Sequence, residues 1–238
     1  MAQTSSLPKY RHGTYSDLAS EYYDSRRHPT SANFREASQY LLAPWLLELL
    51  RPWSRVLEIG AGRSVVAELL ADSGQSPALF VVSDLSPEML SYTPSFLEHP
   101  PSLCLCDAEL LPFASNSFDL IVSSLGDPYN TVDFWQGVAR VVCPEGYVVF
   151  TTPSFEWAKQ FRNGTNLAEF VIADGGAIVV KSCVEEVGEQ RRMIERSGLT
   201  IMERRNVFKH QLHKTPLSPK LRTGPIVSGY LARKDMRS

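Results

Sequence analysis

The sequence of 238 residues is poor in the features that mark membrane-bound and secreted proteins. No apolar run reaches the ~20 residues that a membrane-spanning helix needs. Residues 1–6 contain no basic segment followed by an apolar one, so we expect no secretory signal and predict a cytoplasmic location. The sequence also lacks internal repeats and low-complexity tracts. Its length allows one sizeable α/β domain, or one such domain with a small insertion.

Cysteine is scarce as well, and no pair of cysteines has C-x-x-C spacing. This argues against a disulfide framework and against a zinc site, and we predict no metal site. In an intracellular chain such cysteines are expected to be reduced thiols. The four are Cys104, Cys106, Cys143 and Cys183.

The net charge of −2 hides an uneven distribution of charge along the chain. From residue 201 onward, nine Lys or Arg residues are opposed by only Glu203 and Asp235. A basic surface of this kind can bind phosphate or nucleic acid. No aromatic stacking pattern is interleaved with the charges, which favours a solvated pair of basic strands and argues against a nucleic-acid partner.

The N-terminal part of the sequence has a helical pattern. Residues 15–24 predict a short helix, and 33–50 a long helix that Pro44 should kink or divide. We expect residues 1–50 to form a helical cap or lid on a main domain of residues 51–238. Within that domain, 153–187 breaks the regular rhythm and is expected to be an insertion on the substrate side.

Apolar segments alternate with helical ones through the main domain. This alternation favours a parallel sheet that is covered by helices on both faces. Strands are predicted at 56–59, 79–84, 103–107, 118–124, 147–151, 199–207 and 226–232.

A glycine-rich turn, Gly60-Ala61-Gly62, joins the first of these strands to a helical segment. Such a turn brings backbone N–H groups and the positive end of a helix up to a ligand. The fingerprint of dinucleotide-binding proteins would have a third glycine where Val65 stands, so the turn departs from that fingerprint.

Acidic residues end three successive strands: Glu58, Asp84 and Asp107. In an open parallel sheet, ligands bind at the carboxyl ends of the strands. Asp84 is therefore placed to bind both hydroxyl groups of a ribose. Glu58 would repel a pyrophosphate but would suit a cationic ligand that carries an ammonium group and a sulfonium.

Four segments, in this order, resemble the motifs of class I S-adenosylmethionine-dependent methyltransferases. They are E-I-G-A-G at 58–62, S-D-L-S-P-E-M-L at 83–90, C-D-A-E-L-L-P-F at 106–113 and F-D-L-I-V-S-S at 118–124. The second and third are especially similar to the branch that includes the menaquinone and ubiquinone biosynthesis methyltransferases. The resemblance covers about 52–152, and 15–24 resembles the N-terminal segment of the same branch.

The resemblance implies a doubly wound α/β fold with a seven-stranded, mostly parallel Rossmann-like sheet, an antiparallel last strand and helices on both faces. It also implies S-adenosyl-L-methionine as cofactor and S-adenosyl-L-homocysteine as product. The glycine turn would contact the methionine moiety, Asp84 the ribose, and Asp107 the adenine. The residues implied to bind the cofactor are Glu58, Gly60, Ala61, Gly62, Asp84, Leu85, Met89, Asp107, Ala108, Glu109, Ser123 and Ser124.

The acceptor side is harder to infer from the sequence. Asp127 follows the fourth main-domain strand and should face the methyl group, as an orienting carboxylate or a base, or else simply as a turn residue before a proline. Tyr15, Tyr22, Tyr23 and His28 could form a lid with aromatic faces near the sulfonium, or could be packing residues. Tyr129 is a further candidate on the substrate side.

We predict in-line transfer of a methyl group to a small molecule, at an oxygen, nitrogen or carbon atom. One alternative is a cofactor-binding scaffold or regulatory subunit without turnover. The other is an RNA or nucleotide methyltransferase that uses the basic C-terminal strands. The oligomeric state is not predicted.

Overall fold

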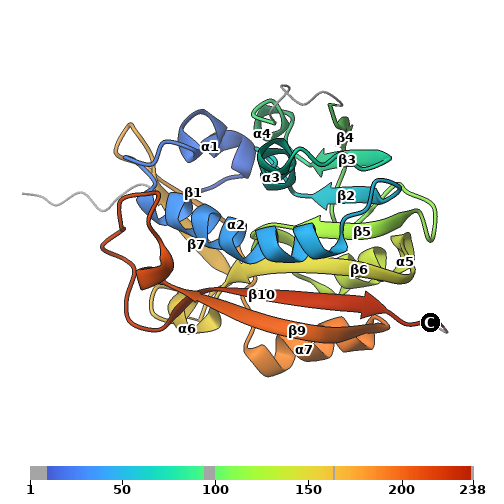
Figure 1. Ribbon diagram of the computed structural model, residues 1–238. Helices are drawn as coiled ribbons and strands as arrows, with labels where there is room; N and C mark the ends of the chain where they lie inside the picture. Colours follow the sequence, from blue (N-terminus) through green and yellow to red (C-terminus); the bar gives the residue numbers. More distant parts are fainter. Residues whose placement is uncertain (1–9, 94–99, 163, 237–238) are drawn as a thin grey trace, which may run out of the picture.

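The structure is a computed structural model that describes residues 10–93, 100–162 and 164–236. Its largest element is a seven-stranded sheet (Figure 1). The strands are β2 (Arg55–Ile59), β3 (Leu79–Asp84), β4 (Ser102–Leu105), β5 (Phe118–Ser123), β6 (Val142–Pro153), β9 (Leu199–Phe208) and β10 (Pro225–Lys234).

These strands lie in the order β4-β3-β2-β5-β6-β10-β9. Strands β2 to β6 pair in parallel, whereas β10 runs antiparallel to both β6 and β9. The predicted fold, a mostly parallel doubly wound sheet with an antiparallel last strand, is therefore confirmed.

Helices cover both faces of the sheet, because side chains alternate between the faces along each strand. Val56 of β2 belongs to a hydrophobic cluster with side chains of α2 and α3. Its neighbour Leu57 belongs to a second cluster, with side chains of α5 and α7. These helices are α2 (Pro29–Leu49), α3 (Val65–Ser73), α5 (Val132–Val141) and α7 (Val187–Arg196), and the short α4 (Pro87–Leu90) follows β3.

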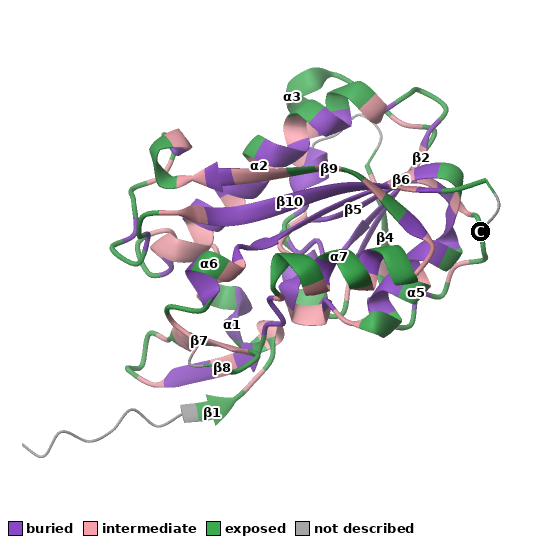
Figure 2. Ribbon diagram, turned by 90° about the horizontal axis from the view of Figure 1, so that it is seen from below, coloured by how far each residue is buried: buried purple, intermediate pink, exposed green. Residues whose placement is uncertain are grey.

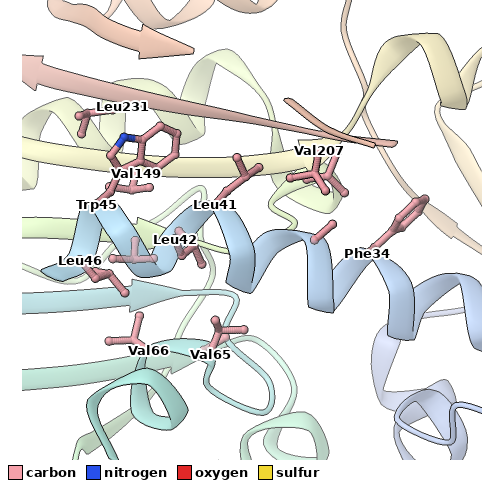
Figure 3. Packing of buried hydrophobic residues seen from close by; sticks show 14 of the residues in the cluster. Phe34, Leu41, Leu42, Trp45, Leu46, Val65, Val66, Val149, Val207 and Leu231 are labelled. Atoms are coloured by element: carbon pink, nitrogen blue, oxygen red, sulfur yellow. The ribbon is translucent and has the colours of Figure 1, made fainter. Parts of the chain in front are cut away.

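Pro44 does not divide helix α2, which continues as one helix from Pro29 to Leu49. Leu41 and Trp45, on either side of the proline in the sequence, both pack between the helix and the sheet (Figure 3). This burial on both sides outweighs the one backbone hydrogen bond that the proline removes. The helix starts at Pro29 because proline at the first helical position loses no intrahelical bond.

A second, three-stranded sheet joins the N-terminus to the segment after β6. It contains β1 (Tyr10–His12), β7 (Leu167–Val171) and β8 (Ala177–Lys181), in the order β1-β8-β7. Helix α1 (Tyr15–Tyr22) packs on it through Leu18. Figure 2 shows this small sheet standing apart from the main one. Strands β1 and β7 and the short α6 (Phe155–Ala158) had no counterpart in the sequence-based prediction.

The loop between β9 and β10, which contains the 3₁₀ turn η2 (Lys209–Gln211), is fastened to α2 by Glu36. The carboxylate of Glu36 accepts the backbone N–H groups of His213, Lys214 and Thr215 at 2.6, 2.7 and 3.0 Å. Because charged hydrogen bonds to backbone donors are strong, this loop is held close to α2 despite its many charges.

Several basic side chains of the C-terminal strands serve the fold. Arg205 pairs with Glu203 and lies over the ring of Trp45. The ammonium group of Lys234 is buried and donates to the carbonyl oxygens of Ala139 and Val142. These contacts explain part of the charge asymmetry without a nucleic-acid partner. In the described parts of the chain, no helix is long and apolar enough to cross a membrane.

We predict that Trp45→Ala lowers the free energy of unfolding by about 3–5 kcal/mol, because it empties a fully buried site in the core. The indole is 0% exposed and its N–H donates to Glu203 at 2.9 Å. Urea denaturation measures the change. Trp53→Ala is the matched control, since Trp53 is 73% exposed and should change the stability little. Equal effects of the two substitutions would contradict this account of the core.

Candidate cofactor and acceptor site

A cavity of about 970 Å³ lies at the carboxyl ends of β2, β3 and β5. The glycine turn 60–62, Asp84 and Ser124 line one side of it. Residues from α1, the start of α2 and the β7–β8 hairpin line the other. Every site residue predicted from the sequence, except Glu58 and Ser123, borders this cavity. The topology thus brings the cofactor and acceptor candidates into one space.

The glycine turn depends on missing side chains at both of its glycines. Gly60 and Gly62 have φ angles of +60° and +48°, a region that favours glycine. A Cβ atom on Gly60 would collide with the hydroxyl oxygen of Tyr129, and one on Gly62 with that of Tyr23. The two tyrosines therefore lie directly against the turn.

Asp84 fixes the turn from the neighbouring strand. One carboxylate oxygen accepts the N–H of Gly62 at 2.8 Å, and the other accepts that of Ser86 at 2.9 Å. Burial raises the pKa of Asp84, and these backbone bonds oppose the rise. The carboxylate is half-buried and keeps its free lone pairs for a ligand in the cavity.

Glu58, which the sequence predicts to bind the cofactor, lies behind the turn, on the face of β2 that α3 covers. It does not line the cavity. It shares this face with Val56, as the alternation along a strand requires. Its carboxylate accepts the hydroxyl of Ser64 and the backbone N–H groups of Val65 and Val66, at the start of α3. Burial raises its pKa to about 7, although these bonds act in the opposite direction. Glu58 therefore acts on the site by holding the helix that follows the turn.

The residues expected at the adenine end lie together. Met89 is buried and Leu85 is exposed, so they offer an apolar wall and an apolar rim. Asp107 accepts the backbone N–H of Glu109 at 2.9 Å. Ala108, the residue between these two in the sequence, is buried. Glu109 does not point freely into the cavity, because its carboxylate binds the ammonium group of Lys181 at 3.2 Å.

The two serines at the end of β5 have different surroundings. Ser123 is fully buried and its hydroxyl lies 3.1 Å from that of Tyr129, so it supports the tyrosine beneath the cavity. Ser124 lines the cavity, with its hydroxyl 2.7 Å from that of Ser38. Only Ser124 is placed to touch a ligand directly.

Asp127 borders the cavity, but its carboxylate is already engaged. It accepts the hydroxyl of Ser182, and the guanidinium of Arg162 lies 3.7 Å away. Both charged side chains are less than 10% exposed. Burial raises the pKa of Asp127 and the charge of Arg162 lowers it. These contacts tie the loop after β5 to the end of β8.

The N-terminal candidates form an aromatic cover. The ring of Tyr22 lies 5.6 Å from that of Tyr15 and 5.0 Å from that of Tyr23. Phe170 of β7 packs against Tyr22 at 5.9 Å and against His28 at 5.6 Å. The predicted lid residues are thus both packed together and part of the cavity wall.

Sequence reasoning missed the charged residues that enclose the site from outside the recognised motifs. Arg35 of α2 pairs with Glu68 at 2.7 Å, and Arg63 pairs with the other oxygen of Glu68 at 2.7 Å. Arg162 and Lys181 reach the cavity from the insertion. No motif marks Arg35, Arg162 and Lys181, whose partners lie far away in the sequence, whereas Arg63 and its partner Glu68 lie within one short segment.

The glycine turn, the acidic strand ends and the fold define a nucleoside-binding α/β domain of the methyltransferase type. Residues 57–150 match the family described as "Methyltransferase domain". These residues therefore form a class I S-adenosylmethionine-dependent methyltransferase domain, and the cofactor of that family is S-adenosyl-L-methionine.

Similar proteins of several kinds share this domain. A malonyl-[acyl-carrier protein] O-methyltransferase of Marinomonas sp. is 33% identical over 143 residues, which are 58% of this chain and 50% of that protein. A demethylmenaquinone methyltransferase of Corynebacterium urealyticum is 39% identical over 110 residues, or 44% of this chain and 45% of that protein. The mitochondrial arginine-hydroxylase NDUFAF5 of Danio rerio is 28% identical over 157 residues, or 64% and 46%. The chain thus spans about half the length of the curated relatives it matches.

Solved structures show the same fold. An S-adenosylmethionine-dependent methyltransferase from Clostridium acetobutylicum superimposes with a TM-score of 0.65 over 93% of this chain and 99% of that one, at 15% identity. At this identity the likeness concerns the fold alone.

We predict that Glu58→Gln removes a pH dependence of stability. Because the pKa of Glu58 is raised in the folded state from 4.5 to about 7, the folded protein binds this proton more tightly than the unfolded chain. The free energy of unfolding should then fall as the pH rises from about 4.5 to 7. Urea denaturation at several pH values measures this slope, which glutamine should flatten. The exposed Glu195→Gln is the control, and an unchanged slope in Glu58→Gln would refute the assignment.

A second prediction concerns Asp127→Ala, which leaves Arg162 buried without its carboxylate. Breaking one half of a buried pair costs about 3–5 kcal/mol of stability. Thermal or urea unfolding should show this loss, whereas Asp133→Ala, at an exposed position of α5, should be nearly neutral. A loss below about 1 kcal/mol in Asp127→Ala would show that the pair does not hold β8 in place.

Proposed function

We propose that this protein binds S-adenosyl-L-methionine against the glycine turn and transfers its methyl group to a small molecule held under the aromatic cover. The observation that carries the proposal is the meeting of turn 60–62, Asp84 and Asp107 with Tyr15 and Tyr22 in one cavity. At the positive-φ turn, the missing side chains of Gly60 and Gly62 leave room for the hydroxyl groups of Tyr129 and Tyr23, which pack directly against the backbone.

The cavity offers matching groups for each part of the cofactor. Asp84 supplies carboxylate oxygens for a ribose diol, and its backbone bonds already orient it. Met89 supplies an apolar wall for a flat base. Asp107 and Ala108 follow β4, where they would bind the edge of that base. The bound sulfonium supplies an activated methyl group, so the chain itself must mainly position the acceptor.

The acceptor side of the cavity supports a small, largely apolar molecule. Phe34, Trp157 and Phe161 line it together with Phe170. Small-molecule sites are typically concave, lined by apolar side chains and supplied with a few polar groups. The related demethylmenaquinone methyltransferase is consistent with a small acceptor. The name of the related malonyl-[acyl-carrier protein] O-methyltransferase refers to a carrier-protein-bound acceptor, and that of the related arginine-hydroxylase to a reaction other than methyl transfer, so both the acceptor and the reaction need to be tested.

We predict that Asp84→Ala weakens binding of S-adenosyl-L-methionine about 10- to 100-fold, because two hydrogen bonds from the ribose to a carboxylate are lost. Isothermal titration calorimetry measures the affinity. Asp133→Ala removes an exposed acid of the same type and should leave the affinity unchanged. Wild-type affinity in Asp84→Ala would remove this residue from the cofactor site.

The function itself is tested by incubating the protein with a metabolite extract and labelled S-adenosyl-L-methionine. A labelled product, identified by mass spectrometry, is the expected result. Cofactor binding without any labelled product would instead favour the scaffold or regulatory subunit.

A further inference from the structure

His28 has an unusual lack of hydrogen bonds for a buried polar side chain. It stands just before α2 and is 7% exposed, and its Nε2 atom is buried without a hydrogen-bond partner. The nearest carboxylate oxygen, Oε2 of Glu21, lies 4.0 Å from Nε2. Nδ1 forms no hydrogen bond with any described part of the chain. Buried polar groups nearly always have partners, and the carboxylate of Glu21 is the group that faces the buried Nε2. Nδ1, which is not buried, is therefore the ring nitrogen that a partner from outside the chain can reach.

The ring lies in the wall of the cavity on its acceptor side. Phe170 packs edge-on against it, and Tyr22 packs against the same phenylalanine. Tyr22 also contacts Tyr23, whose hydroxyl accepts the backbone N–H of Arg63 at 2.7 Å beside the glycine turn. A short chain of rings thus links His28 to the cofactor side of the cavity.

Four other titratable groups that line the cavity, Tyr15, Tyr22, Tyr129 and Asp127, are poorly suited to accept a proton. Burial raises the pKa of Tyr15, Tyr22 and Tyr129 above the ordinary value, so these hydroxyls stay protonated and act as donors. Asp127 is engaged by Ser182 and Arg162, as described above.

His28 has the opposite character. Burial lowers its pKa, and the nearby charges of Arg27 and Lys220 act in the same direction. Glu21 and Asp24 oppose this fall. The imidazole is therefore neutral near pH 7 and free to take up a proton.

We propose that His28 is the general base of an O-methylation, and that the acceptor is an apolar molecule with a weakly acidic hydroxyl group of the phenol or enol type. Nδ1, which is not buried, accepts the hydroxyl proton. Glu21 is the positioning residue, because its carboxylate faces Nε2 and favours the tautomer that carries the hydrogen there. Arg27 at 3.2 Å and the backbone N–H of Ala173 at 3.3 Å hold that carboxylate. This inference rests on the proposed methyl transfer.

The acceptor oxygen forms a bond to the methyl carbon, and the carbon–sulfur bond of the sulfonium breaks with its electron pair left on sulfur. The hydroxyl proton passes to His28, which becomes an imidazolium and later releases the proton to water. General bases of this kind contribute roughly 10²–10⁴-fold to a rate.

The acceptor atom is tested with S-adenosyl-L-methionine carrying a ¹³C-labelled methyl group, incubated with the full chain and a metabolite extract. The carbon chemical shift of the transferred methyl distinguishes oxygen, nitrogen and carbon acceptors. We expect an O-methyl product. A methyl group on nitrogen or carbon would overturn the inference while leaving the proposed function intact. Cofactor binding with no methylated product at all would refute the proposed function, and this inference with it.

The role of His28 is tested with His28→Gln, which we expect to lower the rate about 100-fold or more and to leave cofactor affinity, measured by calorimetry, unchanged. His210→Gln, an exposed histidine in the β9–β10 loop, is the matched control and should retain the wild-type rate. A near-wild-type rate in His28→Gln would overturn the assignment.

The pH dependence provides a readout that a packing role would not move. The wild-type rate should fall as the pH drops through the pKa of His28, which NMR of the imidazole measures directly. Because Glu21 raises this pKa, Glu21→Gln should shift both the NMR titration and the acid limb of the rate to lower pH. If neither shifts, Glu21 does not position the ring. If the acid limb does not follow the NMR titration, His28 is not the base.

Discussion

The site depends on how two carboxylates hold the turn between β2 and α3. Asp84 binds the N–H of Gly62 from the neighbouring strand, and Glu58 binds the first N–H groups of α3 from beneath. The hydrogen bonds from the helix N-terminus offset part of the effect of burial on Glu58, which still raises the pKa of this buried acid to about 7. Together the two carboxylates fix a turn that has no room for a side chain at Gly60, because the hydroxyl of Tyr129 lies against it, and the proposed cofactor site is built on this turn.

The cover of the cavity is assembled from the N-terminal segment and from the insertion that follows β6. Strand β1 pairs in parallel with β8, which lies more than 160 residues later, and α1 packs on the sheet they form. The contacts of Asp127 with Arg162 and Ser182, which lie just before β7 and just after β8, tie this small sheet to the loop after β5. The N-terminal segment and the insertion therefore form one unit, which encloses the proposed acceptor side of the cavity.

Much of the catalytic domain could be predicted from the sequence, because the signals are local. Apolar strand segments, turn glycines and helix N-caps such as Ser86, which caps α4, each depend on a few neighbouring residues. The strands and the positions of Asp84 and Asp107 could therefore be predicted. The orientation of Glu58 could not be placed from the sequence, because the face of β2 on which it lies directs its carboxylate under α3. Its contact with the cofactor stays a prediction. The prediction for Pro44 likewise considered only its effect on the local backbone. Packing of α2 against the sheet keeps the helix undivided at this residue.

The sequence by itself determined the fold class, the glycine turn and the cofactor family, since these rest on periodicity and on motifs spaced along consecutive strands. Only the tertiary structure decided which side chains meet across the cavity. His28 beside Phe170, and Asp127 beside Arg162, are contacts made where the N-terminal cover, the insertion and the main sheet meet. Such contacts join residues far apart in the chain, and their burial changes both their charge and their chemistry.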